Sequence, residues 1–153
     1  YTTPIEFGVS HPVFTPNRLA PLLSKTEELF IRAEAEFAKN GAVTSSYDAY
    51  KAAIQNSFAD AGVSADFDAY WTYIDKGEAS LTLNLIMTEK YKALLCNPEV
   101  FTDYRRTGVP SLKPKAGSEV PSRFPYPDTE TLANSNTPSP ADVTLFTKVW
   151  WDK

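Results

Sequence analysis

Apolar residues recur at helical spacing along the first two thirds of the chain. In residues 24–41 they fall at positions i, i+3 and i+7, which predicts a helix packed against a neighbour. This face comprises Phe30, Ala33 and Phe37, and it is widened by Leu29 and Ile31. Ser24 with Glu27 predicts a capping box at the start, and Asn40-Gly41 predicts the end.

Residues 45–62 repeat this form, with Ser45 or Ser46 as the N-cap and Gly62 as the stop. The apolar stripe comprises Tyr47, Tyr50, Ile54 and Phe58. Small residues that would let a partner helix approach closely are Ala49, Ala52, Ala53 and Ala61. Two amphipathic helices with a short link predict an αα-hairpin of the kind found in helical-repeat arrays, although one hairpin is not a repeat.

Three more helices are expected before the composition changes. Residues 64–77 carry Phe67, Tyr70, Trp71 and Ile74 at helical spacing. Residues 81–95 carry Met87, Tyr91, Leu94 and Leu95 at the same spacing. Residues 96–108 form a short fifth helix, with Asn97 as the cap, Pro98 at the first helical position, and Gly108 and Pro110 at the end.

Prolines dominate the remaining chain, because seven of the twelve fall in the last 44 residues, and they exclude long helices there. Aromatic residues punctuate the same stretch and would be costly to leave in water. They are Phe124, Tyr126, Phe146, Trp150 and Trp151. We therefore predict a mainly α protein, one unit over residues 1–153, with an N-terminal segment (1–23), a helical body (24–108) and an extended tail (109–153) packed over the helices.

Composition excludes several functions. A net charge of −4 without any block of like charge gives no electrostatic footprint for nucleic acid. Cys96 is alone, so the chain builds neither an internal disulfide nor a cysteine-based metal site. No apolar run is long enough for a spanning helix. The chain starts at Tyr1 without a start signal, and we expect it to be a fragment of a longer protein.

Residues for catalysis are sparse. His11 is the single histidine and lies far in sequence from Cys96, which disfavours a Cys/His nucleophile. The six glycines are scattered, so no phosphate loop is formed. Acidic pairs such as Glu34 with Glu36 stand two residues apart, which places them on different helix faces. We predict no enzyme, no cofactor and no metal site.

Aromatic rings are the better binding candidates, since sugars stack their apolar C–H faces on them. Tyr73 lies off the apolar stripe of its helix, so it is expected to be exposed, whereas Trp71 on the stripe is expected to be core. The candidate ligand residues are therefore Tyr73, Trp150 and Trp151.

Arg105 and Arg106 occupy the last turn of the fifth helix, where cations interact favourably with the helix dipole. One of two adjacent arginines should face inward and the other outward. An inward guanidinium is well suited to bonding carbonyls of the tail, so we prefer a structural role over an anion site.

Four segments resemble one protein family: "AEAEFA" (33–38), "IMTEKYKALLCNPEVFTDYRRTGVPSL" (86–112), "VPSRFPYPDTETLANS" (120–135) and "KVWWDK" (148–153). In order and spacing they are similar to the carboxy-terminal part of SusD/RagB-type outer-membrane lipoproteins of the Bacteroidetes.

The resemblance implies a scaffold of tetratricopeptide-like helical hairpins and carbohydrate binding for nutrient uptake at the cell surface, within polysaccharide utilization. It further implies a lipid anchor on an upstream cysteine and association with a TonB-dependent, SusC-like transporter that receives an oligosaccharide. The motif positions Arg105, Arg106, Gly108, Pro110 and Arg123 are expected to be architectural, with Arg105 and Arg123 pinning the last helix to the tail. The alternative is a helical protein-interaction module that binds no sugar.

Overall fold

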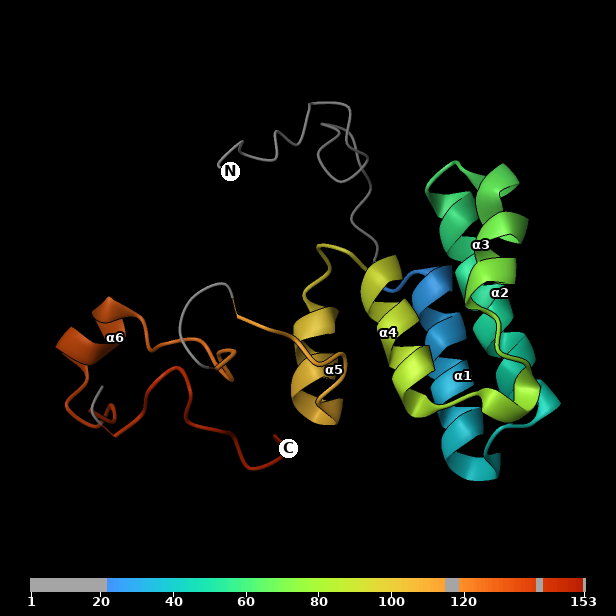
Figure 1. Cartoon of the computed structure of the whole chain (residues 1–153). Helices are drawn as coiled ribbons and strands as arrows, with labels where there is room; N and C mark the ends of the chain where they lie inside the picture. The colour runs from blue at the N-terminus through green and yellow to red at the C-terminus, as the bar shows by residue number, and fades with distance from the viewer. Residues whose placement is uncertain (1–21, 115–118, 140–141, 153) are drawn as a thin grey trace. The chain divides into compact units, whose positions relative to one another are not determined.

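The computed structural model describes residues 22–114, 119–139 and 142–152. These residues are mainly helical and contain no strand (Figure 1), which confirms the predicted class. The helices are α1 (Lys25–Asn40), α2 (Thr44–Asp60), α3 (Phe67–Ile74), α4 (Leu83–Ala93), α5 (Glu99–Thr107) and α6 (Asp128–Ala133), with 3₁₀ turns η2 (Ser64–Asp66) and η3 (Glu78–Ser80).

The chain divides into two compact units, Tyr1–Val100 and Phe101–Lys153, hereafter unit 1 and unit 2. The fifth helix thus groups mostly with the tail. The expected N-terminal segment, residues 1–23, lies outside the described residues except for its last two.

Helix α1 begins and ends where its capping residues predict. Ser24 Oγ accepts a hydrogen bond from the Glu27 amide at 3.1 Å, which satisfies one of the open donors of the first turn. At the other end Gly41 has a φ of 77° and donates to Phe37 O at 2.8 Å. A left-handed residue of this kind is what glycine provides at a helix end.

Helix α2 begins earlier than predicted, at Thr44 after Val43, so neither Ser45 nor Ser46 is its N-cap. Ser46 instead lies inside the first turn, where its Oγ accepts from the Val43 amide at 3.1 Å and approaches Gly41 O at 2.9 Å. Its side chain is fully buried. The serine is thus not the N-cap residue, but from the third helical position it bonds the backbone of the N-cap and closes the short link between the two helices.

The core of unit 1 lies among four helices: α1 and α2 pack side by side, α4 packs on both, and α3 packs on α2 (Figure 1). Buried apolar side chains at the predicted positions are Leu29, Phe30, Ala33, Ala49, Tyr50, Ala53, Ile54, Phe67, Trp71, Met87 and Leu94. Two predicted members are wrong: Ile31 is 46% exposed and Leu95 is 54% exposed. Each lies at the edge of its apolar stripe, so its side chain stays in solvent although the preceding residue, Phe30 or Leu94, is buried.

Polar contacts fasten the open end of the α1–α2 pair. Thr26 at the start of α1 is buried and donates to Asp60 Oδ2 at 2.7 Å at the end of α2. Asn56 donates to both, at 2.9 Å to Thr26 Oγ1 and 3.1 Å to Asp60 Oδ2. The pair is therefore closed at both ends, by a tight link at Gly41 and by this side-chain cluster.

Unit 2 is built differently, because none of its described residues is fully buried. Leu145 O accepts from the amides of Ser122 and Arg123, at 2.8 and 3.2 Å, and joins two tail segments. The rings of Phe101 on α5 and Phe124 meet edge to face at 5.6 Å between centroids. The tail is thus attached to α5; its packing over the hairpins stays a prediction.

Several aromatic residues of the tail are not covered by unit 2 itself. Phe124 is 79% exposed, Phe146 46% and Tyr126 37%. The prolines and turns of this stretch give no long helix among its described residues, and the packing of these rings over the helical hairpins stays a prediction. Exposed rings are therefore a feature of unit 2.

Candidate functional site

Tyr73 projects from the outer face of α3. Its side chain is 81% exposed, whereas Phe67 and Trp71 on the inner face are 5% and 9% exposed. This separation follows from the helical period, since Tyr73 lies off the apolar stripe. Tyr73 is the exposed ring of α3 and stays a candidate ligand residue.

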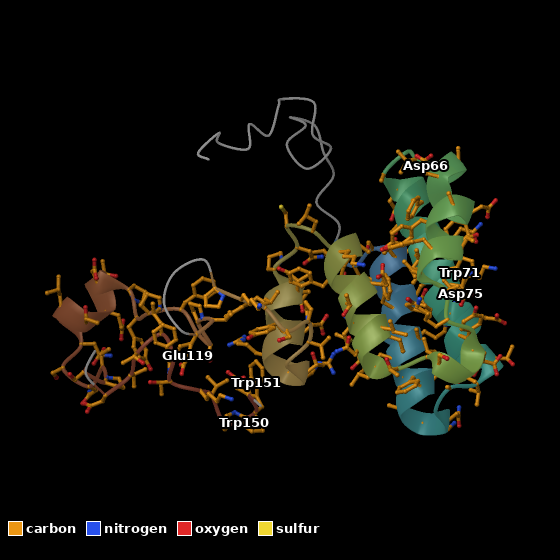
Figure 2. The ribbon with its side chains drawn as sticks, viewed as in Figure 1. Asp66, Trp71, Asp75, Glu119, Trp150 and Trp151 are labelled. Carbon is orange, nitrogen blue, oxygen red and sulfur yellow. The ribbon has the colours of Figure 1, made fainter. Side chains whose placement is uncertain are left out.

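Trp71 belongs to the core of unit 1, as its position on the stripe predicts, and Figure 2 places it within the helical body. Its ring centroid lies 5.7 Å from that of Tyr47 and 5.8 Å from that of Tyr50. Lys51 Nζ lies 5.3 Å from the ring centroid, a cation–π contact that occupies a face of the indole. Trp71 is therefore not available to stack on a ligand.

Trp150 and Trp151 occupy the centre of a turn in unit 2, closed by a hydrogen bond from the Asp152 amide to Val149 O at 3.0 Å. Trp150 is 95% exposed, while Trp151 is half-buried. Figure 2 labels both side chains near α5. The two candidate residues thus differ: one ring is open to solvent and the other is held by the protein.

Arg105 holds Trp151. The guanidinium carbon lies 4.4 Å from the Phe101 ring centroid and 4.5 Å from the Trp151 ring centroid. Arg105 Nη1 also donates to Ser122 O at 3.1 Å. A planar, weakly hydrated cation is the side chain best suited to stacking on rings while it bonds a carbonyl. We name the Phe101, Arg105 and Trp151 side chains the arginine stack.

The other motif positions lie around this stack and contact the chain itself. Arg106 is exposed and pairs with Asp103 Oδ1 at 2.8 Å on the same helix. Gly108, with a φ of 72°, donates to Tyr104 O at 2.7 Å and ends α5, and a cis bond precedes Pro110. The Arg123 guanidinium lies 5.2 Å from the Tyr126 ring centroid. Arg105 therefore bonds the residue next to Arg123, and the two arginines stack on different rings.

Sequence reasoning missed the ring partners of Arg105. Phe101 precedes it by four residues, so both side chains lie on one face of α5, and this spacing was a usable signal. Trp151 offered no such signal, because it lies far along the tail. The stack therefore depends on a tertiary contact that spacing within one element does not reveal.

Unit 1 holds a second polar cluster, between α3 and α4. Tyr70 donates to Glu89 Oε2 at 2.6 Å, and Lys92 Nζ donates to Glu89 Oε1 at 2.5 Å. Glu89 is only 7% exposed, so both of its oxygens need these partners. Burial, together with the bond to Glu89, raises the pKa of the Tyr70 hydroxyl above its usual value. This cluster joins the two helices.

Other expected or excluded sites can be placed briefly. Within residues 22–114, 119–139 and 142–152 no group of three or more His, Cys, Asp or Glu could hold a metal. The helices of that same part of the chain are all too short or too polar to cross a membrane. Cys96 is exposed, and His11 lies outside the described residues.

Comparison with known families adds the decisive observation. The sequence model of a SusD-like family, described as "Starch-binding associating with outer membrane", matches residues 5–127. The chain belongs to this SusD-like family. No curated protein and no solved structure matches it. The matched region includes Tyr73, Arg105 and Arg123 and ends before Trp150 and Trp151, so the exposed indole lies in the part of this SusD-like chain beyond the family match.

Proposed function

We propose that this SusD-like chain is part of a surface-exposed outer-membrane lipoprotein that binds a glycan without chemical change and delivers it to a TonB-dependent, SusC-like transporter. The family match over residues 5–127 is the observation on which this rests, because the family is described as starch-binding and associated with the outer membrane. The RagB-type relationship, the nutrient-uptake role and the lipid anchor are parts of the same proposal.

The described residues support glycan binding in two ways. Each unit presents an exposed ring, Tyr73 in unit 1 and Trp150 in unit 2, and such rings bind the apolar faces of sugars. The α1–α2 pair packs side by side, and we take it as one hairpin of the proposed tetratricopeptide-like scaffold, which is suited to presenting surfaces. Binding by ring stacking and hydroxyl hydrogen bonds requires no acid/base group.

Glycan binding is tested by titrating the purified chain with neutral oligosaccharides, with maltoheptaose as the starch fragment and cellohexaose and xylohexaose as comparisons. Tryptophan fluorescence is the readout, because Trp150 is exposed while Trp71 is buried. We expect a saturable change with at least one glycan. A flat response to the whole panel, also by calorimetry, would contradict the proposal and favour the protein-interaction module.

Anchoring and delivery need a separate experiment on cells. We expect the native product in the membrane fraction to carry a diacylglyceryl cysteine, detected as intact mass and by lipid analysis. We further expect a TonB-dependent transporter to copurify with it after mild detergent extraction. An unlipidated product in the aqueous fraction, with no transporter bound, would contradict this part of the proposal.

A further inference from the structure

We propose that Trp150 is a sugar-stacking platform of this protein and that the arginine stack sets its orientation. The inference rests on the proposed function, since it needs a glycan ligand. It goes further by assigning the contact to one ring outside the matched family region and by dividing the two neighbouring tryptophans into a binding residue and a positioning residue.

The first step is the anchor. Arg105 is fixed to the tail by its hydrogen bond to Ser122 O at 3.1 Å, and it lies against Phe101 on its own helix. Trp151 stacks on the same guanidinium at 4.5 Å. A ring held by a cation that is itself bonded to backbone has little freedom to rotate. Trp151 is therefore the fixed point of the C-terminal segment.

The second step is the turn. The Asp152 amide bonds Val149 O at 3.0 Å, so Trp150 and Trp151 are the two central residues of one closed turn. With Trp151 held by Arg105, the turn presents Trp150 on its open side, where the side chain is 95% exposed. The exposure of Trp150 is thus a consequence of how Trp151 is anchored.

The segment before this turn is fixed as well. Residues 144–147 form an earlier turn, in which the Thr147 amide donates to Thr144 O at 3.1 Å and the Thr144 amide donates to Thr147 Oγ1 at 2.9 Å. Leu145 O in this turn accepts from two backbone amides of the 122–123 segment. Both turns are therefore tied to other parts of unit 2, and the earlier one presents Phe146, which is 46% exposed.

These features define the chemistry of the ligand. A flat indole that is open to solvent and held from behind matches the C–H face of a pyranose ring, and a pre-oriented ring loses little freedom on binding. Arg105, the cation that holds the neighbouring Trp151, is already engaged with rings and a carbonyl, so it is not presented to an anionic ligand. Lys148 and Asp152 stand on the two sides of the turn with opposite charges, so the flanking residues favour neither an acidic nor a basic sugar. A neutral oligosaccharide is therefore the ligand, with an α-glucan first because of the family description.

The test measures affinity for maltoheptaose, cellohexaose and xylohexaose by calorimetry in the wild-type chain and its variants. We expect Trp150→Ala to lower the affinity for the tightest-binding glycan about tenfold or more. Trp150→Tyr keeps a ring and should retain most of the affinity. Equal binding by wild type and Trp150→Ala would overturn the inference while leaving the proposed function intact. Absence of binding by wild type to every glycan would overturn the proposed function and this inference with it.

The positioning role has its own readout. In a Trp150→Phe background Trp71 and Trp151 both emit, and we expect Arg105→Ala to lower the tryptophan anisotropy and the near-ultraviolet circular dichroism through Trp151, since Trp71 lies in the core of unit 1. In the otherwise wild-type chain, Arg105→Ala should lower the affinity for the glycan severalfold. Arg106→Ala is the matched control on the same helix and should leave the affinity unchanged. Arg105→Lys tests whether a positive charge alone is enough to hold Trp151. We expect its affinity and anisotropy to be close to those of Arg105→Ala, because an ammonium group does not stack between rings. Unchanged anisotropy and affinity in Arg105→Ala, with helical content retained, would overturn this role.

Discussion

Unit 1 and unit 2 are stabilised by different interactions. Unit 1 has a continuous apolar core in which Phe30, Ala33, Ala53 and Ile86 are essentially inaccessible to water. Unit 2 has no fully buried side chain among its described residues, and it is held by the arginine stack, one ring pair and backbone bonds to Leu145 O. One unit is organised by burial and the other by directional contacts.

The difference explains where ligand-facing groups are found. Burial fixes many side chains at once but removes their rings from solvent, as it does with Trp71. A few directional contacts fix a backbone while leaving neighbouring rings open, as they do with Trp150. Unit 2 is therefore suited to presenting aromatic side chains even though it has little core of its own.

Removing an aromatic ring from the core of unit 1 should cause the largest loss of stability. Phe30 is fully buried, and we expect Phe30→Ala to lower the free energy of unfolding by about 3–5 kcal/mol, because a cavity forms between the helices. Urea unfolding followed by circular dichroism measures it. The adjacent Ile31→Ala is the control and should cost far less, since Ile31 is 46% exposed. Similar losses in both variants would show that Ile31 is also packed in solution.

Breaking the arginine stack should have an intermediate effect confined to unit 2. Arg105→Ala removes a charged hydrogen bond and two ring contacts, and we expect it to lower the local stability by about 1–3 kcal/mol. Hydrogen exchange of the Ser122 and Arg123 amides, which bond Leu145 O, measures this loss. Amides of α1 and α2 should keep their protection. Faster exchange throughout unit 1 would show that the two units are not independently stabilised.

Alkaline pH should lower the stability of unit 1 by a smaller amount. Burial, then the hydrogen bond to Asp75, raises the pKa of Tyr47 to about 12, and burial also raises the pKa of Tyr50 and Tyr70. Because an unfolded tyrosine ionises near pH 10, the stability contributed by these hydroxyls is complete below about pH 10 and is lost as pH rises towards 12. Urea midpoints between pH 8 and 11.5 measure this decline.

The Tyr47→Phe variant sharpens the same test. It removes a 2.7 Å hydrogen bond to Asp75 and should cost about 1 kcal/mol at neutral pH. Above pH 10 its stability should fall less steeply than that of wild type, while Tyr50 and Tyr70 keep part of the slope. Parallel curves for the two proteins would mean that Tyr47 ionises alike in the folded and unfolded chain.

The smallest effect on stability is expected at the proposed platform. Trp150→Ala removes a large side chain that is 95% exposed. The free energy of unfolding should therefore change by no more than about 0.5 kcal/mol, which appears as a small shift in melting temperature. Differential scanning calorimetry measures it. A loss similar to that of Arg105→Ala would show that Trp150 packs against protein in solution instead of facing the solvent.

Local patterns predicted unit 1 well and unit 2 poorly, for a physical reason. Helix faces and caps depend on residues within one or two turns, so Phe30, Trp71 and Ser24 were placed correctly. Whether a residue at the edge of an apolar stripe is buried depends on which neighbouring element covers it. The predicted burial of Ile31 and Leu95 was therefore wrong.

In the tail, the apolar residues predicted that covering Phe124 would be favourable, but they did not identify Phe101 as the ring that it contacts. The inward orientation of Arg105 follows from its place at a helix end, whereas its stacking on Trp151 depends on the path of the tail between them. Directional contacts between distant segments are thus the part of the site that the sequence patterns left open.

The closed α1–α2 pair also has a kinetic consequence. Its two helices are adjacent in sequence and joined by the short link at Gly41, and Thr26 is hydrogen-bonded to Asp60 at the other end. Forming the pair therefore costs little loop-closure entropy. We expect this hairpin to be structured in the folding transition state, with α4 docking onto it and the tail ordering last. Substitutions in the hairpin, such as Ala53→Gly, should then slow folding, whereas those in the arginine stack should leave the folding rate of unit 1 unchanged.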